Sequence, residues 1–147
     1  MALANDPEDI VGWQRLDDRI TTSGRITAAD VARLKAIGVR HVVNLALATS
    51  PGAFAEEAEA LAAAGLRYTH IPVPFDAPEE AHFERFCEAI EADDAPVHVH
   101  CMMNWRVSAF FYRYHRDTLG MPEPAARALM ERQWSPETST NSDAPTW

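Results

Sequence analysis

Three short runs of apolar and β-branched residues stand out in the pattern of hydrophobic positions. They span residues 40–47, 67–73 and 96–101 and read RHVVNLAL, RYTHIPV and PVHVHC. Runs of this length, rich in Val and Ile, are typical of strands that are buried in a sheet. Segments with helical spacing separate the runs, and this alternation predicts βαβ units with parallel strands.

Helical segments before and after the first run carry end signals. A Thr-x-x-Asp capping signal begins at Thr27, and Gly38 ends the helix that follows it. The next segment is rich in Ala, with Ser50 as its cap, Pro51 in its first turn and Gly65 as its stop. Two helices are therefore expected in front of the second strand.

Helical spacing returns in segments 76–94, 105–120 and 122–134, and the remaining residues 135–147 form a polar tail. The apolar stripes of the first two segments are Phe83, Phe86, Cys87 and Ile90, then Val107, Phe110, Phe111 and Tyr114. The whole pattern predicts a three-layer α/β fold, in which helices flank a mainly parallel central sheet.

Composition and charge narrow the class of protein. The chain has 147 residues, 47% of them hydrophobic, which suits one compact domain over residues 1–147. A net charge of −9 disfavours nucleic acid and anionic membranes as partners. The sequence has no membrane span, no signal-peptide pattern and only two cysteines, so we expect a cytoplasmic protein with reduced thiols.

The strongest chemical signal is the stretch from Cys101 to Arg106, which joins a predicted strand to a predicted helix and reads CMMNWR. A turn of this kind directs backbone N–H groups and the positive end of a helix dipole at one point, where an oxyanion binds. The same field favours thiolate over thiol at Cys101, and the Arg106 guanidinium can grip two oxygens. Attack of the thiolate on a phosphate ester would give a thiophosphate intermediate, without a cofactor or a metal.

The loop resembles the signature of the cysteine-dependent protein tyrosine and dual-specificity phosphatases, in which His-Cys is followed by a short loop and an Arg at a helix start. Here His100 and Cys101 are followed by four residues before Arg106, where that family usually has five. Four-residue loops are shared by rhodaneses and by a bacterial phosphatase-like group, the DUF442 or beta-lactamase-hydrolase-like group. The second is the better match, because its Ser-Gly turn, helix, Gly and strand ending in Asn-Leu are similar to residues 23–45.

The resemblance implies a phosphotyrosine phosphatase type of fold and assigns roles to residues of the loop. By resemblance, Cys101 is the nucleophile, Arg106 holds the phosphate and His100 orders the loop. Ser108, two positions after Arg106, stands in for the hydroxyl that usually follows the Arg directly. The backbone of the loop, including Asn104, is expected to bind the phosphate oxygens.

The resemblance also implies a general acid, an Asp on the loop after the preceding strand, and Asp76 occupies that position. Asp76-Ala-Pro-Glu79 is equally a capping box, and a carboxylate held by helix N–H groups is a poor proton donor. Glu79, Glu80 and His82 are the alternative donors.

Other residues near the loop have two interpretations each. Met102, Met103 and Trp105 either form an apolar rim for the substrate or pack inward, and Arg25, beside the Ser-Gly turn, could reach the substrate. His98 and His100 have a metal-ligand spacing. No third or fourth ligand stands at suitable spacing, so we expect no metal and a buried, hydrogen-bonded His98.

The sequence therefore predicts a phosphomonoester hydrolase whose substrate is a phosphorylated protein or a small phosphomonoester. Two alternatives from other classes remain open. One is a rhodanese-like sulfurtransferase that carries a persulfide on Cys101, and the other is a non-catalytic phosphate-binding module.

Overall fold

The computed structural model of the chain describes residues 6–47, 56–74, 78–92 and 94–134. Its sheet has five strands in the order β1-β2-β5-β3-β4. The strands are β1 (Gln14–Arg15), β2 (Ile20–Ser23), β3 (His41–Asn44), β4 (Arg67–His70) and β5 (Val97–His100). The helices are α1 (Ala28–Ala36), α2 (Glu57–Ala63), α3 (Glu80–Glu91), α4 (Trp105–Arg113) and α5 (Glu123–Glu131), and a π-helical turn, η1 (Tyr114–Thr118), extends α4.

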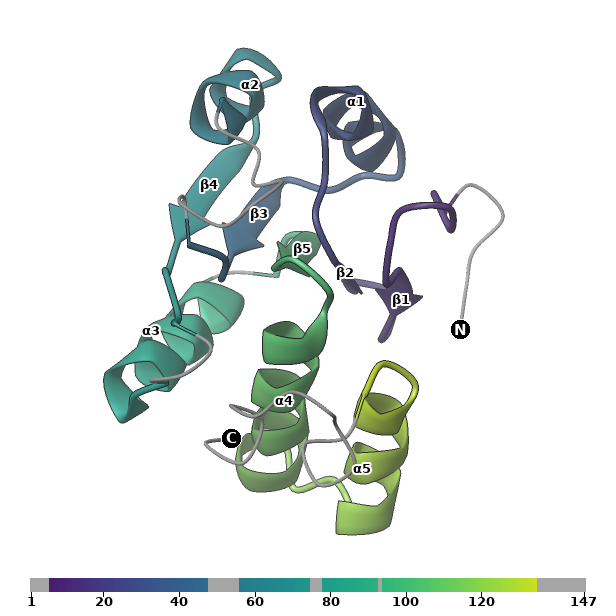
Figure 1. Cartoon of the computed structure of the whole chain (residues 1–147), viewed down its shortest axis with the longest axis vertical. Helices are drawn as coiled ribbons and strands as arrows, with labels where there is room; N and C mark the ends of the chain where they lie inside the picture. Colours follow the sequence, from purple (N-terminus) through teal and green to yellow (C-terminus); the bar gives the residue numbers. More distant parts are fainter. Residues whose placement is uncertain (1–5, 48–55, 75–77, 93, 135–147) are drawn as a thin grey trace.

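The sheet lies between two layers of helices, as the hydrophobic pattern predicted. Helices α1 and α2 cover one face, and α3 and α4 cover the other, with α5 packed beside α4 (Figure 1). β2, β5, β3 and β4 run parallel, and only the short β1 pairs antiparallel, with β2. The three predicted strands are confirmed as β3, β4 and β5.

Side chains alternate between the two faces of β5, and this alternation builds two cores. Val97 and Val99 pack with Phe86 and Phe110 of α3 and α4. On the other face, a second core joins α1 and α2 to the sheet, with Leu34 and Leu61 fully buried. His98 and His100 occupy the alternate positions of β5, toward α1 and α2. No helix in the described segments is long and apolar enough to cross a membrane.

Both ends of α1 lie where the capping signals in the sequence predicted them. The backbone N–H and the hydroxyl of Thr27 both donate to the carboxylate of Asp30, at 2.9 and 3.1 Å. Gly38 ends α1 with a φ of +96°, a conformation that L side chains rarely adopt. The predicted cap of α2, Ser50 with Pro51, lies outside the described residues, as does the tail of residues 135–147.

The hydrophobic pattern missed β2, which lies between β1 and β5. Its residues Thr21, Thr22 and Ser23 are polar, yet all are buried. Burial is possible because each hydroxyl is hydrogen-bonded: two of them contact His98 at 2.8 Å, and that of Thr22 donates to the carbonyl of Gln14. A run of Thr residues carries a β-branched signal, but its partner on β5 is about 75 residues away.

Candidate active site

The carboxyl ends of the parallel strands form one row, and Cys101 follows the central strand of this row. The register pairs His100 with Ser23 of β2 on one side and with Asn44 of β3 on the other, and Asn44 with His70 of β4. Segments that leave these strands therefore meet around Cys101. Ligands of open α/β sheets bind at this edge.

Cys101 and Arg106 lie at the two ends of the loop, and both are held by backbone carbonyls. Cys101 is 1% exposed, and its N–H donates to the carbonyl of Ser23 at 3.4 Å. Arg106 lies in the first turn of α4 and is 7% exposed. Its Nη1 donates to the carbonyl of Val73 at 2.9 Å. A buried cation thus lies at a helix start, where only an anion would compensate both its charge and the helix dipole.

Asn104 holds the loop in place through buried hydrogen bonds. Its backbone is left-handed, with a φ of +67°, and its side chain is fully buried. The amide nitrogen donates to the carbonyl of Gly12 at 2.7 Å and to the hydroxyl of Thr22 at 3.0 Å, while the amide oxygen accepts from Ser108 Oγ at 3.1 Å. The side chain of Asn104 is thus directed into the protein, and the expected contact of the loop backbone with phosphate stays a prediction. The hydroxyl of Ser108 contacts the loop through Asn104.

Two glycines allow the N-terminal segment to touch the loop. A Cβ on Gly24 would lie 2.6 Å from the carbonyl oxygen of Met102, and one on Gly12 would lie 3.1 Å from Cβ of Asn104. The N–H of Arg25 donates to the same Met102 oxygen at 3.0 Å. The Ser-Gly turn therefore fixes the loop by close backbone contact, which a side chain would prevent.

His98 is buried with both ring nitrogens hydrogen-bonded, as predicted. The hydroxyl of Ser23 donates to the carbonyl of Gly24, so it must accept from Nε2 of His98, and Nδ1 then accepts from Thr21. Burial, and secondarily the charge of His100, lowers the pKa of His98 well below 6.5, so the ring is neutral. With both nitrogens engaged, His98 is not available as a metal ligand, and the described residues contain no group of three such ligands.

His100 has a partner that the sequence did not indicate. Its Nε2 lies 2.8 Å from Oε2 of Glu57, the first residue of α2, and both side chains are buried. Its Nδ1 lies 3.5 Å from the carbonyl oxygen of Cys101. The sequence did not single out Glu57, because no local pattern marks a buried acid.

The proposed acid, Asp76, lies outside the described residues, but the structure describes the alternative proton donors that follow it in the sequence. α3 begins at Glu80 and is capped by Glu79, whose N–H donates to Nδ1 of His82 at 3.0 Å. A capping box is therefore formed by Glu79 and His82, and the alternative in which Asp76 is a cap stays a prediction. Glu80 pairs with Arg113, whose hydrogen bond lowers the pKa of Glu80 and makes it a poor proton donor.

Of the side chains near the loop that were predicted to contact the substrate, some are exposed at the surface and others pack into the interior. Met103 is 42% exposed, and Arg25 is also exposed. Met102 is half-buried against the core. Trp105 stacks on Trp134 at 5.3 Å between ring centroids, and so it joins α4 to the segment after α5. Met103 and Arg25 are the two predicted contacts that remain open to solvent.

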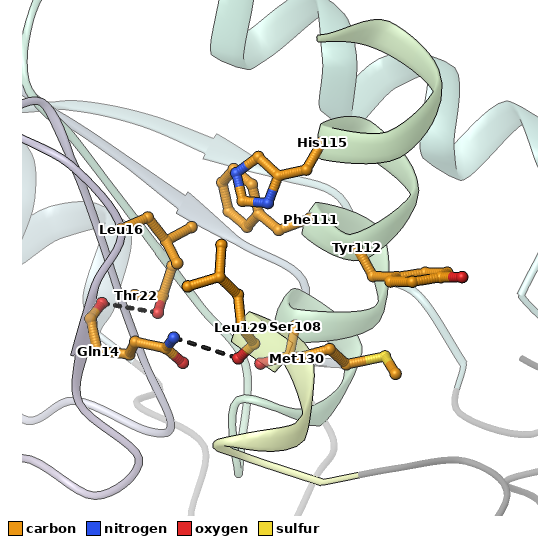
Figure 2. Close-up of a pocket in the computed structure, with 9 residues that line it drawn as sticks. All are labelled: Gln14, Leu16, Thr22, Ser108, Phe111, Tyr112, His115, Leu129 and Met130. Atoms are coloured by element: carbon orange, nitrogen blue, oxygen red, sulfur yellow. Dashed lines mark hydrogen bonds between the residues drawn. The ribbon is translucent and has the colours of Figure 1, made fainter. Parts of the chain in front are cut away.

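A narrow cavity lies behind the loop, between α4, α5 and the N-terminal strands. Figure 2 shows its lining residues: Gln14, Leu16, Thr22, Ser108, Phe111, Tyr112, His115, Leu129 and Met130. Gln14 donates to the carbonyl of Leu129 at 3.2 Å, so β1 is tied to α5 across this space. Burial lowers the pKa of His115, which keeps its ring neutral in this setting. The polar wall of the cavity includes both hydroxyls that hold Asn104.

The second cysteine is not part of the site. Cys87 lies on α3, half-buried against the core, as its place on the apolar stripe predicted. Burial raises the pKa of its thiol to about 11, so it stays protonated and unreactive at neutral pH.

A parallel sheet between helices, with a Cys-to-Arg loop at the carboxyl edge of its central strand, defines the fold of the protein tyrosine phosphatase-like proteins. Residues 13–112 match the family described as the phosphatase-like domain of beta-lactamase hydrolase-like proteins. The chain belongs to this family. No curated protein matches it in sequence.

Solved structures have the same fold. A candidate phosphatase (DUF442) of Shewanella putrefaciens CN-32 is 26% identical with a TM-score of 0.82, over 99% of this chain and 93% of that one. TpbA of P. aeruginosa, in a complex with pTyr, is 21% identical with a TM-score of 0.72, over 100% and 86% of the two chains. The core catalytic domain of the PP-IP phosphatase SIW14 of S. cerevisiae shares the fold at 11% identity, with a TM-score of 0.71 over 93% and 85%.

Proposed function

We propose that this protein is a cysteine-dependent phosphomonoester hydrolase. The observation that carries the proposal is the loop itself: Cys101 directly follows β5, Arg106 lies in the first turn of α4, and buried hydrogen bonds of Asn104 hold the turn between them. A turn of this kind is expected to direct backbone N–H groups, a helix start and a guanidinium at one thiol. Membership of a phosphatase-like family and the pTyr-bound relative support a phosphomonoester as the substrate.

The reaction has two steps in this proposal. The thiolate of Cys101 attacks phosphorus, an S–P bond forms, and the P–O bond to the leaving group breaks while Asp76 donates a proton to that oxygen. Water then attacks the thiophosphate, and Asp76 takes up its proton. Phosphate leaves and the thiolate is restored. Arg106 and the loop N–H groups bind the phosphoryl oxygens throughout.

The exposed groups beside the loop fit a phosphorylated side chain or a small phosphate ester. Met103 offers an apolar contact to the group that carries the phosphate, and Arg25 offers a charge to a second anionic group. Every group in the scheme is a side chain or a backbone group of this chain. EDTA is therefore expected to leave turnover unchanged.

The test is hydrolysis of p-nitrophenyl phosphate with EDTA present, in the wild type, Cys101→Ser and Cys87→Ser. Turnover that is lost only in Cys101→Ser supports the proposal, because Cys87 is a protonated thiol away from the loop. Equal hydrolysis in the wild type and Cys101→Ser would contradict it. If the wild type is inactive, thiosulfate:cyanide transfer and phosphate binding test the two remaining classes.

A further inference from the structure

The pair formed by Glu57 and His100 is unusual in its burial and in its position. The two side chains are 3% and 4% exposed, and 43 residues of sequence separate them. His100 directly precedes Cys101, while Glu57 belongs to a helix on the other side of β3. We propose that Glu57 is a positioning residue, which accepts a hydrogen bond from Nε2 of His100 and so fixes this ring and the peptide that it contacts at Cys101. This inference rests on the proposed function.

The hydrogen-bond geometry supports this positioning role. Imidazole is a stronger base than carboxylate, so the hydrogen between Oε2 of Glu57 and Nε2 of His100 belongs to the ring. The remaining nitrogen, Nδ1, faces the carbonyl oxygen of Cys101 at 3.5 Å. This distance is at the outer limit of a hydrogen bond, and such contacts often shorten when a substrate binds.

The burial of Glu57 is not explained by stability alone. A buried ion pair is often no better than apolar side chains of similar volume, because both charges lose their hydration. The second carboxylate oxygen, Oε1, is buried and has no hydrogen-bond partner among the described residues. Tyr68 is close enough for the charge of Glu57 to raise its pKa, in addition to the larger effect of burial. An apolar residue at this position would fill the same space without these costs, and so the carboxylate is better explained by its effect on His100.

The effect on the nucleophile follows from the place of His100. The ring lies one residue before Cys101, and its contact with the Cys101 carbonyl oxygen orients the peptide that joins β5 to the loop. Removing the charge of Glu57 should therefore slow reactions of the Cys101 thiolate, while binding of the phosphate by Arg106 and the loop N–H groups should change little.

The chain offers a matched control on the same helix. Glu57→Gln keeps an oxygen that accepts from Nε2 but removes the charge. Glu59→Gln makes the same change of charge at an exposed position two residues later. Two reactions of Cys101 are compared: its alkylation by iodoacetamide, mapped by peptide mass with Cys87 as the slow internal reference, and hydrolysis of p-nitrophenyl phosphate.

We expect Glu57→Gln to lower the alkylation rate of Cys101 and kcat by about tenfold, with KM little changed, as for other partners that orient a functional histidine. Glu59→Gln should match the wild type. Glu57→Gln combined with His100→Asn should be no slower than His100→Asn alone, because Glu57 acts through His100. Equal rates in Glu57→Gln and the wild type, or equal losses in Glu57→Gln and Glu59→Gln, would overturn the proposal.

A second measurement uses the unchanged protein and does not depend on how the variants fold. Nitrogen-15 spectra of the histidine rings at neutral pH should show Nε2 of His100 protonated, whereas a bare Nε2 would overturn the proposal. The alkylation assay also separates this inference from the proposed function. A wild type without phosphatase turnover, whose Cys101 alkylation still depends on Glu57, would contradict the hydrolase and retain the positioning role.

Discussion

The side-chain amide of Asn104 donates a hydrogen bond to the hydroxyl of Thr22 at 3.0 Å, which ties the loop after Cys101 to β2 across 82 residues of sequence. The same amide donates to the carbonyl of Gly12, and Thr22 donates onward to Gln14. A chain of buried hydrogen bonds therefore runs from the candidate phosphate-binding loop to the edge of the sheet. Its strength depends on every member keeping its partner.

Substitution of Asn104 should reduce both stability and turnover. Asn104→Gly suits the positive φ but removes the hydrogen bonds, and it should lower the free energy of unfolding by about 1–3 kcal/mol. Asn104→Ala adds backbone strain of about 1 kcal/mol to that loss. Urea unfolding and p-nitrophenyl phosphate hydrolysis measure the two effects. A Gly variant as stable and as active as the wild type would show that the hydrogen bonds do not hold the loop.

A methyl group at position 24 should distort the loop. Gly24→Ala would place Cβ 2.6 Å from the carbonyl oxygen of Met102, so the loop must shift, and we expect turnover to fall about tenfold or more. Gly38→Ala is the control, because its Cβ would meet no atom within 4 Å although its φ of +96° is strained. That variant should lose stability but retain kcat. Similar kcat values for both variants would contradict the close-contact role of Gly24.

Below about pH 6.5, the stability of the folded protein should decrease as the pH falls, because His98 is buried in its neutral form. Its pKa in the folded protein is well below 6.5, so below that pH the unfolded chain binds a proton that the folded chain does not. The contribution is complete above about pH 6.5 and is lost as the pH falls toward the folded pKa, at about 1.4 kcal/mol per pH unit. His115, whose pKa burial also lowers, adds to this slope.

Urea unfolding from about pH 7.5 to about pH 5.5 measures this slope. The control is His98→Gln, whose amide can keep hydrogen bonds to Thr21 and Ser23 but does not titrate. The variant should be less stable at neutral pH and should show a shallower slope. An unchanged slope in His98→Gln would mean that other groups cause the pH dependence.

The role of Asp76 can be tested with leaving groups of different basicity. If Asp76 protonates the leaving oxygen, Asp76→Asn should slow phenyl phosphate, which has a basic leaving group, at least about tenfold more than p-nitrophenyl phosphate. Glu79→Gln is the comparison for an alternative donor, since Glu79 caps α3. Equal losses of turnover on both substrates in Asp76→Asn would contradict its role as the general acid. A loss of phenyl phosphate turnover alone in Glu79→Gln would assign that role to Glu79.

The sequence by itself determined most elements of the fold and the position of the candidate phosphate-binding loop between β5 and α4. The strands β3, β4 and β5, the ends of α1 at Thr27 and Gly38, and the apolar face of α4 depend on spacing and caps within a few residues. The Cys101 to Arg106 turn is equally local, since strand, loop and helix follow one another. Such features are visible in a sequence because the residues that cause them are neighbours in it.

Only the tertiary structure decided which side chains support that turn. β2 is a buried strand because His98 satisfies its hydroxyls, Asn104 points inward because Gly12 and Thr22 accept its amide, and Trp105 packs inward because Trp134 covers it. Glu57 reaches His100 across 43 residues. A buried polar residue is stabilised by its partner and not by its neighbours along the chain, so its role appears only when the fold brings the two together.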